Sequence, residues 1–310
     1  MNILVSGSLA YDRIMDFPGK FEDHILPEKI HILNVCFTVS GLAEYFGGTA
    51  GNIAYSLALL DEFPTILASA GKDFGRYRDW LVSHGLPLEG IRLVSDEFTA
   101  GAYITTDMAD NQITGFNPGA MKLPSEYDLS DVNPAETWAI ISPGNPDDML
   151  GYSRRYKEMG IRFIFDPGQQ IPILQGDHIA EMIEGSEILI SNDYELEMII
   201  KATGWDKTRL LQRTRTIITT LGEDGSVLVT PKDQEEVPVA KPARVVDPTG
   251  AGDAYRAGLL KGLAMGKDLH YAATIGATCA SYAVEIQGTQ EHRFTPEQVW
   301  DRHKQNFAWV

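Results

Sequence analysis

Short apolar runs alternate with amphipathic stretches along most of this chain, and glycine-rich turns separate the two kinds of segment. The apolar runs are typical of buried strands and lie at residues 3–6, 65–70, 91–94, 139–141, 163–166, 188–191, 216–219 and 227–229. Helical patterns lie between them, at residues 52–60, 75–84, 146–159 and 193–202. Short strands separated by helices indicate a mainly parallel sheet that carries helices on both faces. The pattern therefore predicts an α/β fold of three layers.

A second group of strand-like segments mixes polar with apolar positions, near residues 11–16, 30–39, 102–106 and 112–116. The last two segments predict a β-hairpin. We expect this group to form a small lid sheet, within residues 11–45 and 98–120, that is inserted into a single domain spanning residues 1–310. Tyr103 and Phe116 suit stacking on a nucleobase, and they suit the core of the lid equally well.

Composition narrows the class of protein. The chain has 310 residues and a formal net charge of −17, which argues against a general affinity for nucleic acid. Its two cysteines, Cys36 and Cys279, lack metal-ligand spacing and fit a reducing compartment. No basic leader precedes the first strand, and no apolar run reaches membrane-spanning length. We therefore expect a cytoplasmic protein with no membrane partner.

The stretch from Val246 to Gly258 carries the strongest chemical signal. Gly250 and Gly252 flank a turn that opens an apolar helix, and the first N–H groups of a helix point outward and attract an anion. Asp253, just inside the helix, has the position of a general base beside such an anion site. The alternative is a helix-capping acid. Small residues recur at positions 254, 258 and 262, which predicts a thin helix face that packs close to a sheet.

A second glycine-rich loop, Gly47–Gly48, precedes Asn52 and another helix. By itself it is equally a flexible connector. Asp12 follows the first strand, where ligands gather in open α/β sheets, although it also suits a turn. Together, Asn52 and Asp12 would supply the donor and acceptor groups that a vicinal diol needs.

Further polar clusters lie at the ends of later strands. Asn192 and Glu195 begin a helix, where an acidic first turn is also favourable by itself. One carboxylate acting through water is a sensible partner for Mg²⁺. Gln169 and Gln170 carry amides that suit the edge of a base.

The string D-P-T-G-A-G-D-A-Y-R-A-G, from Asp247 to Gly258, resembles the C-terminal signature of the PfkB (ribokinase-like) family of carbohydrate and nucleoside kinases. G-G-x-x-x-N around Gly48 resembles its N-terminal signature, and N-x-x-E at Asn192 and T-L-G-x-x-G at Thr220 resemble two further motifs. The resemblance covers nearly the whole chain. Several spellings look like bacterial adenosine kinases of the mycobacterial type and related nucleoside kinases, such as Phe116–Met121 and Gly288–Glu291.

The resemblance implies a ribokinase-like αβα fold and a role for each matching residue. Asp253 would be the catalytic base, beside an anion hole built from Gly250, Ala251 and Gly252. The residues implied for the nucleoside are Ser8, Asp12, Gly48, Asn52, Tyr103, Phe116, Met121, Gln169 and Gln170. Those implied for ATP are Asn192, Thr220, Gly222 and Gly225. Glu195 would place Mg²⁺ through water, and the residues implied for K⁺ are Asp247, Thr249 and Gly288.

By this resemblance, the protein transfers phosphate from ATP to the 5′-hydroxyl of a purine ribonucleoside, with adenosine as the first expectation. The base pocket departs from the adenosine-specific pattern, because Tyr103 stands where those relatives tend to have Phe. A changed polar group alters base choice strongly. A broad nucleoside kinase, a sugar kinase and a catalytically silent nucleoside binder therefore remain alternatives. The resemblance also suggests a homodimer formed through the lid.

Overall fold

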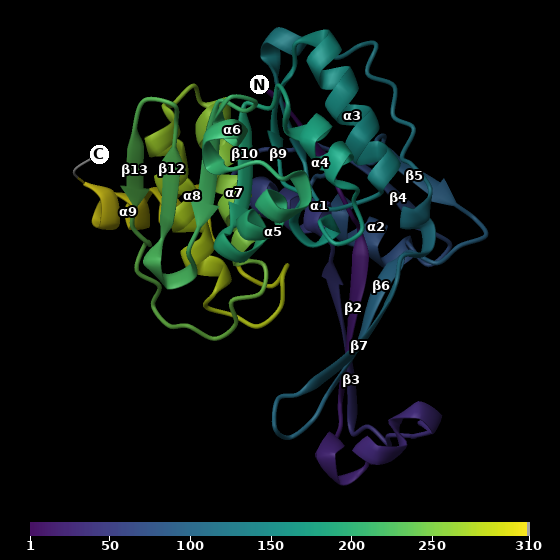
Figure 1. Cartoon of the computed structure of the whole chain (residues 1–310). Helices are drawn as coiled ribbons and strands as arrows, with labels where there is room; N and C mark the ends of the chain where they lie inside the picture. Colours follow the sequence, from purple (N-terminus) through teal and green to yellow (C-terminus); the bar gives the residue numbers. More distant parts are fainter. Residues whose placement is uncertain (309–310) are drawn as a thin grey trace.

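The computed structural model describes residues 1–308, and a nine-stranded sheet forms its centre (Figure 1). The strand order is β13-β12-β11-β10-β9-β8-β1-β4-β5, and every pair from β11 to β5 is parallel. The strands are β1 (Asn2–Ser6), β4 (Thr65–Gly71), β5 (Ile91–Val94), β8 (Thr137–Ile141), β9 (Arg162–Phe165), β10 (Ile188–Asn192), β11 (Thr216–Thr220), β12 (Ser226–Val229) and β13 (Gln234–Val237). The apolar runs thus predicted these strands up to β12 correctly.

Helices cover both faces of this sheet because its strands are apolar on both sides. On β1, Ile3 and Val5 belong to one buried cluster and Leu4 to another, as the two-residue period of a strand requires. The helices on the first face are α1 (Thr49–Ala58), α2 (Gly75–Ser83), α7 (Ala251–Ala264) and α8 (Leu269–Ala283), with α9 (Pro296–Phe307) packed on α8. Those on the second face are α3 (Pro146–Met159), α4 (Gly176–Ile183), α5 (Asp193–Thr203) and α6 (Lys207–Leu211). The predicted three-layer α/β fold is confirmed.

A separate four-stranded sheet extends away from the main body (Figure 1). Its order is β3-β2-β6-β7, and its strands are β2 (Ala10–Asp16), β3 (Gly41–Gly47), β6 (Ala100–Thr106) and β7 (Gln112–Asn117). We call this sheet the lid. The predicted strand near residues 11–16 and the predicted hairpin are therefore confirmed.

The predicted strand at residues 30–39 is wrong. A 3₁₀ helix occupies Pro27–Ile32, and the strand that pairs with β2 is β3, further along the chain. The aromatic side chains of this region instead form a small cluster at the tip of the lid, in which Phe37 contacts Phe17 and Phe21. Residues 30–39 are rich in β-forming side chains, but these do not alternate with polar ones as they would in a strand with one buried face. They therefore do not join the lid sheet.

The thin face of α7 packs on a helix and not on the sheet, which corrects a second expectation. A Cβ atom at Gly258 would lie 2.7 Å from the Ile275 carbonyl oxygen, and one at Gly262 would lie 2.5 Å from Ala272 Cα. Both neighbours belong to α8. The small residues therefore hold α7 and α8 close together, which fixes the helix that begins at the glycine-rich loop. Within residues 1–308, no helix is both long and apolar enough to cross a membrane.

Candidate active site

Two cavities open at the carboxyl ends of the central strands and share one wall. The first has a volume of about 600 Å³ and the second about 510 Å³. Five residues line both cavities, namely Thr49, Pro143, Gln169, Gly250 and Asp253. A site at the ends of parallel strands is expected for this architecture. Asp253 thus lies at the boundary of the two cavities, where it can contact ligands in both.

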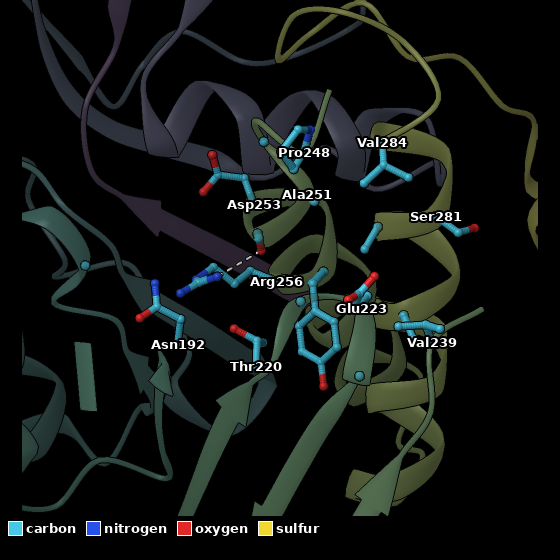
Figure 2. A pocket seen from close by; sticks show the side chains of 18 of the residues that line it. Asn192, Thr220, Glu223, Val239, Pro248, Ala251, Asp253, Arg256, Ser281 and Val284 are labelled. Atoms are coloured by element: carbon cyan, nitrogen blue, oxygen red, sulfur yellow. Dashed lines mark hydrogen bonds between the residues drawn. The ribbon is translucent and has the colours of Figure 1, made fainter. Parts of the chain in front are cut away.

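The first cavity is bounded by α7, α8 and the ends of β9 to β11 (Figure 2). It gathers all nine residues predicted for ATP, Mg²⁺ or catalysis, namely Asn192, Glu195, Thr220, Gly222, Gly225, Gly250, Ala251, Gly252 and Asp253. The second cavity gathers most residues predicted to bind the nucleoside, namely Ser8, Asp12, Gly48, Asn52, Phe116, Met121, Gln169 and Gln170. The structure therefore separates the two predicted groups into two adjoining spaces.

Asp253 lies in the first turn of α7, which begins after Gly250 with φ of 81°. Burial raises the pKa of the Asp253 carboxyl to about 6, while Arg256 and a hydrogen bond from Asn52 oppose that rise. The N–H of Ala251 is bonded to the Pro248 carbonyl at 3.2 Å. The N–H groups of Gly252 and Asp253 at the start of the helix then remain for a ligand. The arrangement offers an ionisable acceptor beside backbone donors.

A chain of hydrogen bonds fixes the direction of the Asn52 amide. The Trp80 indole can only donate, and its Nε1 donates to Gln290 Oε1 at 2.9 Å. Gln290 Nε2 therefore donates to Asn52 Oδ1 at 3.0 Å, and Asn52 Nδ2 donates to Asp253 Oδ2 at 2.8 Å. Asn52, predicted to bind a sugar, thus also holds the predicted base. Trp80 and Gln290 were not predicted, because they lie far apart in the sequence.

Asp12 lies on the lid strand β2 and faces the second cavity. Burial raises the pKa of its carboxyl, and among residues 1–308 its oxygens have no hydrogen-bond partner. Gly47 makes room for it, because a Cβ there would lie within 3.0 Å of the Asp12 carboxyl carbon. An open carboxylate at a cavity wall is suited to accept hydrogen bonds from hydroxyl groups.

The strand register of the lid separates Tyr103 from Phe116. Asp12, Ala102 and Phe116 share one row across β2, β6 and β7, and all three line the second cavity. Tyr103 lies on the next row, so it points to the opposite face, where its hydroxyl accepts a hydrogen bond from Arg13 at 3.0 Å. The structure therefore places Tyr103 on the lid face that is turned away from the second cavity, apart from the other residues predicted to bind the nucleoside.

Gln170 is buried against the second cavity with its amide half satisfied. Its Nε2 donates to the Gly144 carbonyl at 2.8 Å, while its Oε1 has no partner within residues 1–308. A buried acceptor without a partner is costly, so a ligand that donates to it is favoured. Ser8 has a more structural role, because its Oγ accepts from the Thr49 N–H at 3.0 Å and so helps to start α1.

Asn192 and Glu195 form a reciprocal cap at the start of α5. Asn192 Oδ1 accepts from the Glu195 N–H at 2.7 Å, and Glu195 Oε2 accepts from the Asn192 N–H at 2.9 Å. The alternative of an acidic first turn is thus observed, and both residues also line the first cavity. Burial raises the pKa of Glu195. The helix cap is thus observed, and the roles of Asn192 and Glu195 toward ATP and Mg²⁺ stay predictions.

Asp247 ties two loops together. Its two carboxylate oxygens accept from the N–H groups of Thr249, at 2.9 Å, and Gly288, at 3.2 Å. Burial would raise the pKa of Asp247, but these donors and the Thr249 hydroxyl hold it below its ordinary value. The three residues predicted to hold K⁺ therefore meet, and the cation itself stays a prediction. Among residues 1–308, no cluster of three or more His, Cys, Asp or Glu has metal-binding geometry.

Comparison with known proteins places this site in a family. The family model for pfkB family carbohydrate kinases matches residues 19–296. The chain is a member of the pfkB family. It is therefore a phosphotransferase that acts on a hydroxyl group.

Several relatives that match this chain over most of its length at about 30% identity or more are named nucleoside kinases. One from Methanocaldococcus jannaschii is 33% identical over 278 residues, which cover 89% of this chain and 91% of the relative. A solved nucleoside kinase from the same organism has a TM-score of 0.88 at 31% identity and covers 98% of this chain and 99% of its own. A nucleoside kinase from Burkholderia thailandensis in complex with inosine has a TM-score of 0.84 at 35% identity, with 99% and 98% covered. These likenesses confirm the resemblance found in the sequence.

Proposed function

We propose that this pfkB-family protein transfers the terminal phosphoryl group of ATP to the 5′-hydroxyl of a purine ribonucleoside. The observation that carries the proposal is Asp253, which lines both cavities at their shared wall. ATP would occupy the first cavity and the nucleoside the second. A base at this wall reaches the acceptor hydroxyl while the N–H groups of Gly252 and Asp253 face the phosphoryl group.

The reaction follows from this placement. Asp253 takes the proton of the 5′-hydroxyl while the new O5′–P bond forms and the bond to the ADP oxygen breaks. A pKa of about 6 leaves the carboxylate largely ionised at neutral pH and still basic. Asn52 holds the carboxylate through its hydrogen bond at 2.8 Å. Asp12 on the lid would accept from the ribose hydroxyls.

Mg²⁺ fits the first cavity, because Glu195 lines it and, within residues 1–308, only Oε2 of its two carboxylate oxygens accepts a hydrogen bond. When bound, the ion would neutralise part of the phosphate charge. The phosphates of ATP would supply most of its ligands, with Glu195 acting through water. K⁺ near Asp247 and Thr249 is a secondary expectation.

Adenosine is the first candidate substrate and inosine the second. Gln170 Oε1 is an unpaired acceptor, which suits the exocyclic amine of adenine and equally the N1–H of hypoxanthine. The nucleoside kinase of Burkholderia thailandensis, 35% identical in sequence, is described in complex with inosine, which supports the second candidate.

The test is ADP release with ATP and Mg²⁺ across adenosine, inosine, guanosine, cytidine, ribose and fructose 6-phosphate. Turnover highest on adenosine or inosine supports the proposal. Comparable turnover on all nucleosides would make this a broad nucleoside kinase, whereas turnover on a sugar alone would remove the base-pocket assignment. Tight nucleoside binding without ADP release would mean a silent binder.

A further inference from the structure

Arg256 is a buried cation at the edge of the first cavity. It lies on α7 one turn after Gly252, and only 7% of its surface is exposed. Its Nε and Nη2 donate to the two carboxylate oxygens of Asp166, the latter at 2.8 Å, and its Nη1 donates to the Gly252 carbonyl at 3.0 Å. Figure 2 shows the side chain extending from α7 toward Asn192 and Thr220. The guanidinium is thus fixed in place from two sides.

Two of its donors remain unused. A guanidinium has five N–H groups, and Asp166 and Gly252 occupy three of them. The remaining groups are on Nη1 and Nη2, at the end of the side chain that lines the cavity. A Cβ atom at Gly252 would lie 2.9 Å from Nη1, so these donors stand directly beside the N–H groups that begin α7. Backbone and guanidinium donors therefore form one cluster.

Arg256 is a positive charge among lining side chains that are otherwise negative or neutral. Among the described residues that line either cavity, Arg256 is the only Lys, Arg or His. The acids among them are Asp12, Asp166, Glu195, Glu223 and Asp253. A phosphoryl group in transfer spreads negative charge over three oxygens, and a fixed positive charge stabilises it strongly. Without Arg256, the side chains of this site would present only negative charge to ATP.

The ion pair with Asp166 is a weak explanation for the presence of Arg256. Burying two charges is costly, and a buried pair often adds no stability compared with apolar side chains of similar size. Asp166 is 2% exposed and both of its oxygens bind Arg256, so it serves to orient the guanidinium. An oriented, permanently charged fork with free donors is suited to binding phosphate.

We propose that Arg256, oriented by Asp166, donates its two remaining Nη–H groups to the phosphoryl group that passes from ATP to the nucleoside. This inference rests on the proposed function. Arg256 stays protonated throughout, because the proton of the 5′-hydroxyl goes to Asp253 and the electron pair of the broken bond goes to ADP. Its donation to the Gly252 carbonyl also polarises the peptide whose N–H belongs to Asp253. Arg256 is thus a catalytic residue and Asp166 a positioning residue.

The test compares Arg256→Gln with the double variant Asp166→Asn/Arg256→Gln. We expect Arg256→Gln to lower kcat by about 10³-fold or more. Its affinity for a non-hydrolysable ATP analogue should fall about tenfold, and its affinity for ADP should change by less than about threefold. The double variant removes both charges, so it should regain thermal stability but not activity. Arg154→Gln, at an exposed ion pair on α3, is the matched control and should leave turnover unchanged.

Two results would overturn the inference. One is a folded Arg256→Gln variant with kcat within tenfold of the wild type, and the other is recovery of activity in the double variant, which would make the pair purely structural. If Arg256→Gln does not fold, the double variant gives the same comparison. Wild-type protein without turnover on any nucleoside would instead refute the proposed function, while the contrast between ATP analogue and ADP would still test Arg256.

Discussion

Asp253 and its neighbours show how far single side chains determine this site. The carboxyl is held by Asn52, whose amide direction is set by Gln290 and finally by the donor-only indole of Trp80. Each hydrogen bond in this series has a fixed direction, from Trp80 through Gln290 and Asn52 to Asp253. Asp253 lines both cavities, so the acceptor capacity that Asn52 leaves unused is available to a ligand there. Burial keeps the carboxyl near the pKa that a base needs at neutral pH.

The pH dependence of kcat/KM should report this carboxyl. Burial raises the pKa of Asp253 to about 6, and the base works only when ionised. Activity should therefore be nearly constant above about pH 7 and about tenfold lower at pH 5 than at pH 7, because only about a tenth of the carboxyl is ionised one unit below its pKa. Steady-state rates at saturating ATP between pH 5 and 8 measure this. A profile that stays flat down to pH 5 would exclude Asp253 as a base with this pKa.

Gln290→Glu tests the hydrogen-bond chain. Glutamate has nearly the same shape but no donor, so Asn52 Oδ1 loses its partner and the amide no longer has a fixed direction. We expect kcat/KM to fall by about 10–100-fold, since a lost hydrogen bond to a charged network is worth about 1.5–3 kcal/mol. Gln234→Glu, on the exposed strand β13, is the control. Equal kcat/KM values for the two variants would show that the hydrogen bonds from Trp80 to Asp253 do not contribute to catalysis.

Residue-scale prediction from the sequence succeeded where a motif is local and failed where a contact is distant. The glycine-rich loop and Asp253 were identifiable because a short string carries the signature. The Arg256–Asp166 pair joins positions 90 apart, and Trp80–Gln290 joins positions 210 apart, so no local pattern reveals either. The lid face on which Tyr103 lies could not be predicted, because the register of the lid strands depends on tertiary pairing.

At the scale of elements, α7 contributes Asp253 and Arg256 to the site, and close packing against α8 fixes the position of α7. The small residues of α7 allow the two helix backbones to approach, as the 2.7 Å distance from a Cβ at Gly258 to the Ile275 carbonyl indicates. The strands of the central sheet were predictable because they are apolar on both faces. β3 was missed because Gly41, Glu44 and Gly47 interrupt its pattern, although its pairing with β2 stabilises it.

Gly258→Ala should separate these helices. The added methyl group overpacks the α7–α8 contact, so we expect a loss of about 2 kcal/mol in the free energy of unfolding, together with reduced kcat. Gly151→Ala in α3 is the matched control, because nothing lies within 4 Å of its Cβ position, and it should stabilise by about 0.5 kcal/mol. Urea denaturation measures both. Equal stability of the two variants would contradict the close packing of α7 on α8.

At the scale of the whole molecule, the lid projects from the body and has two unlike faces (Figure 1). The face with Asp12 and Phe116 lines the second cavity. The other face carries Tyr103, and its next row includes Leu42 and Ile113, whose side chains are 66% and 45% exposed. Exposed apolar residues on a sheet often mark a protein contact. This face is the candidate surface for the homodimer that the resemblance suggests.

Ile113→Lys tests the dimer. A charge on this face should shift the protein from dimer to monomer in sedimentation at micromolar concentration, since burying an unpaired charge is costly. The thermal stability of the monomer should be nearly unchanged, because Ile113 is not part of the core. A wild-type protein that sediments as a monomer at all concentrations would contradict a lid-mediated dimer.

The central claim is that Asp253 is the base at the wall between the ATP and nucleoside cavities. The most direct measurement compares wild type and Asp253→Asn in ADP release with ATP, Mg²⁺ and adenosine or inosine, alongside nucleoside binding by calorimetry. We predict that kcat falls by about 10³-fold or more, while the dissociation constant of the nucleoside changes by less than about threefold. Near-normal turnover in the variant would contradict the claim, because another group would then have to take the proton.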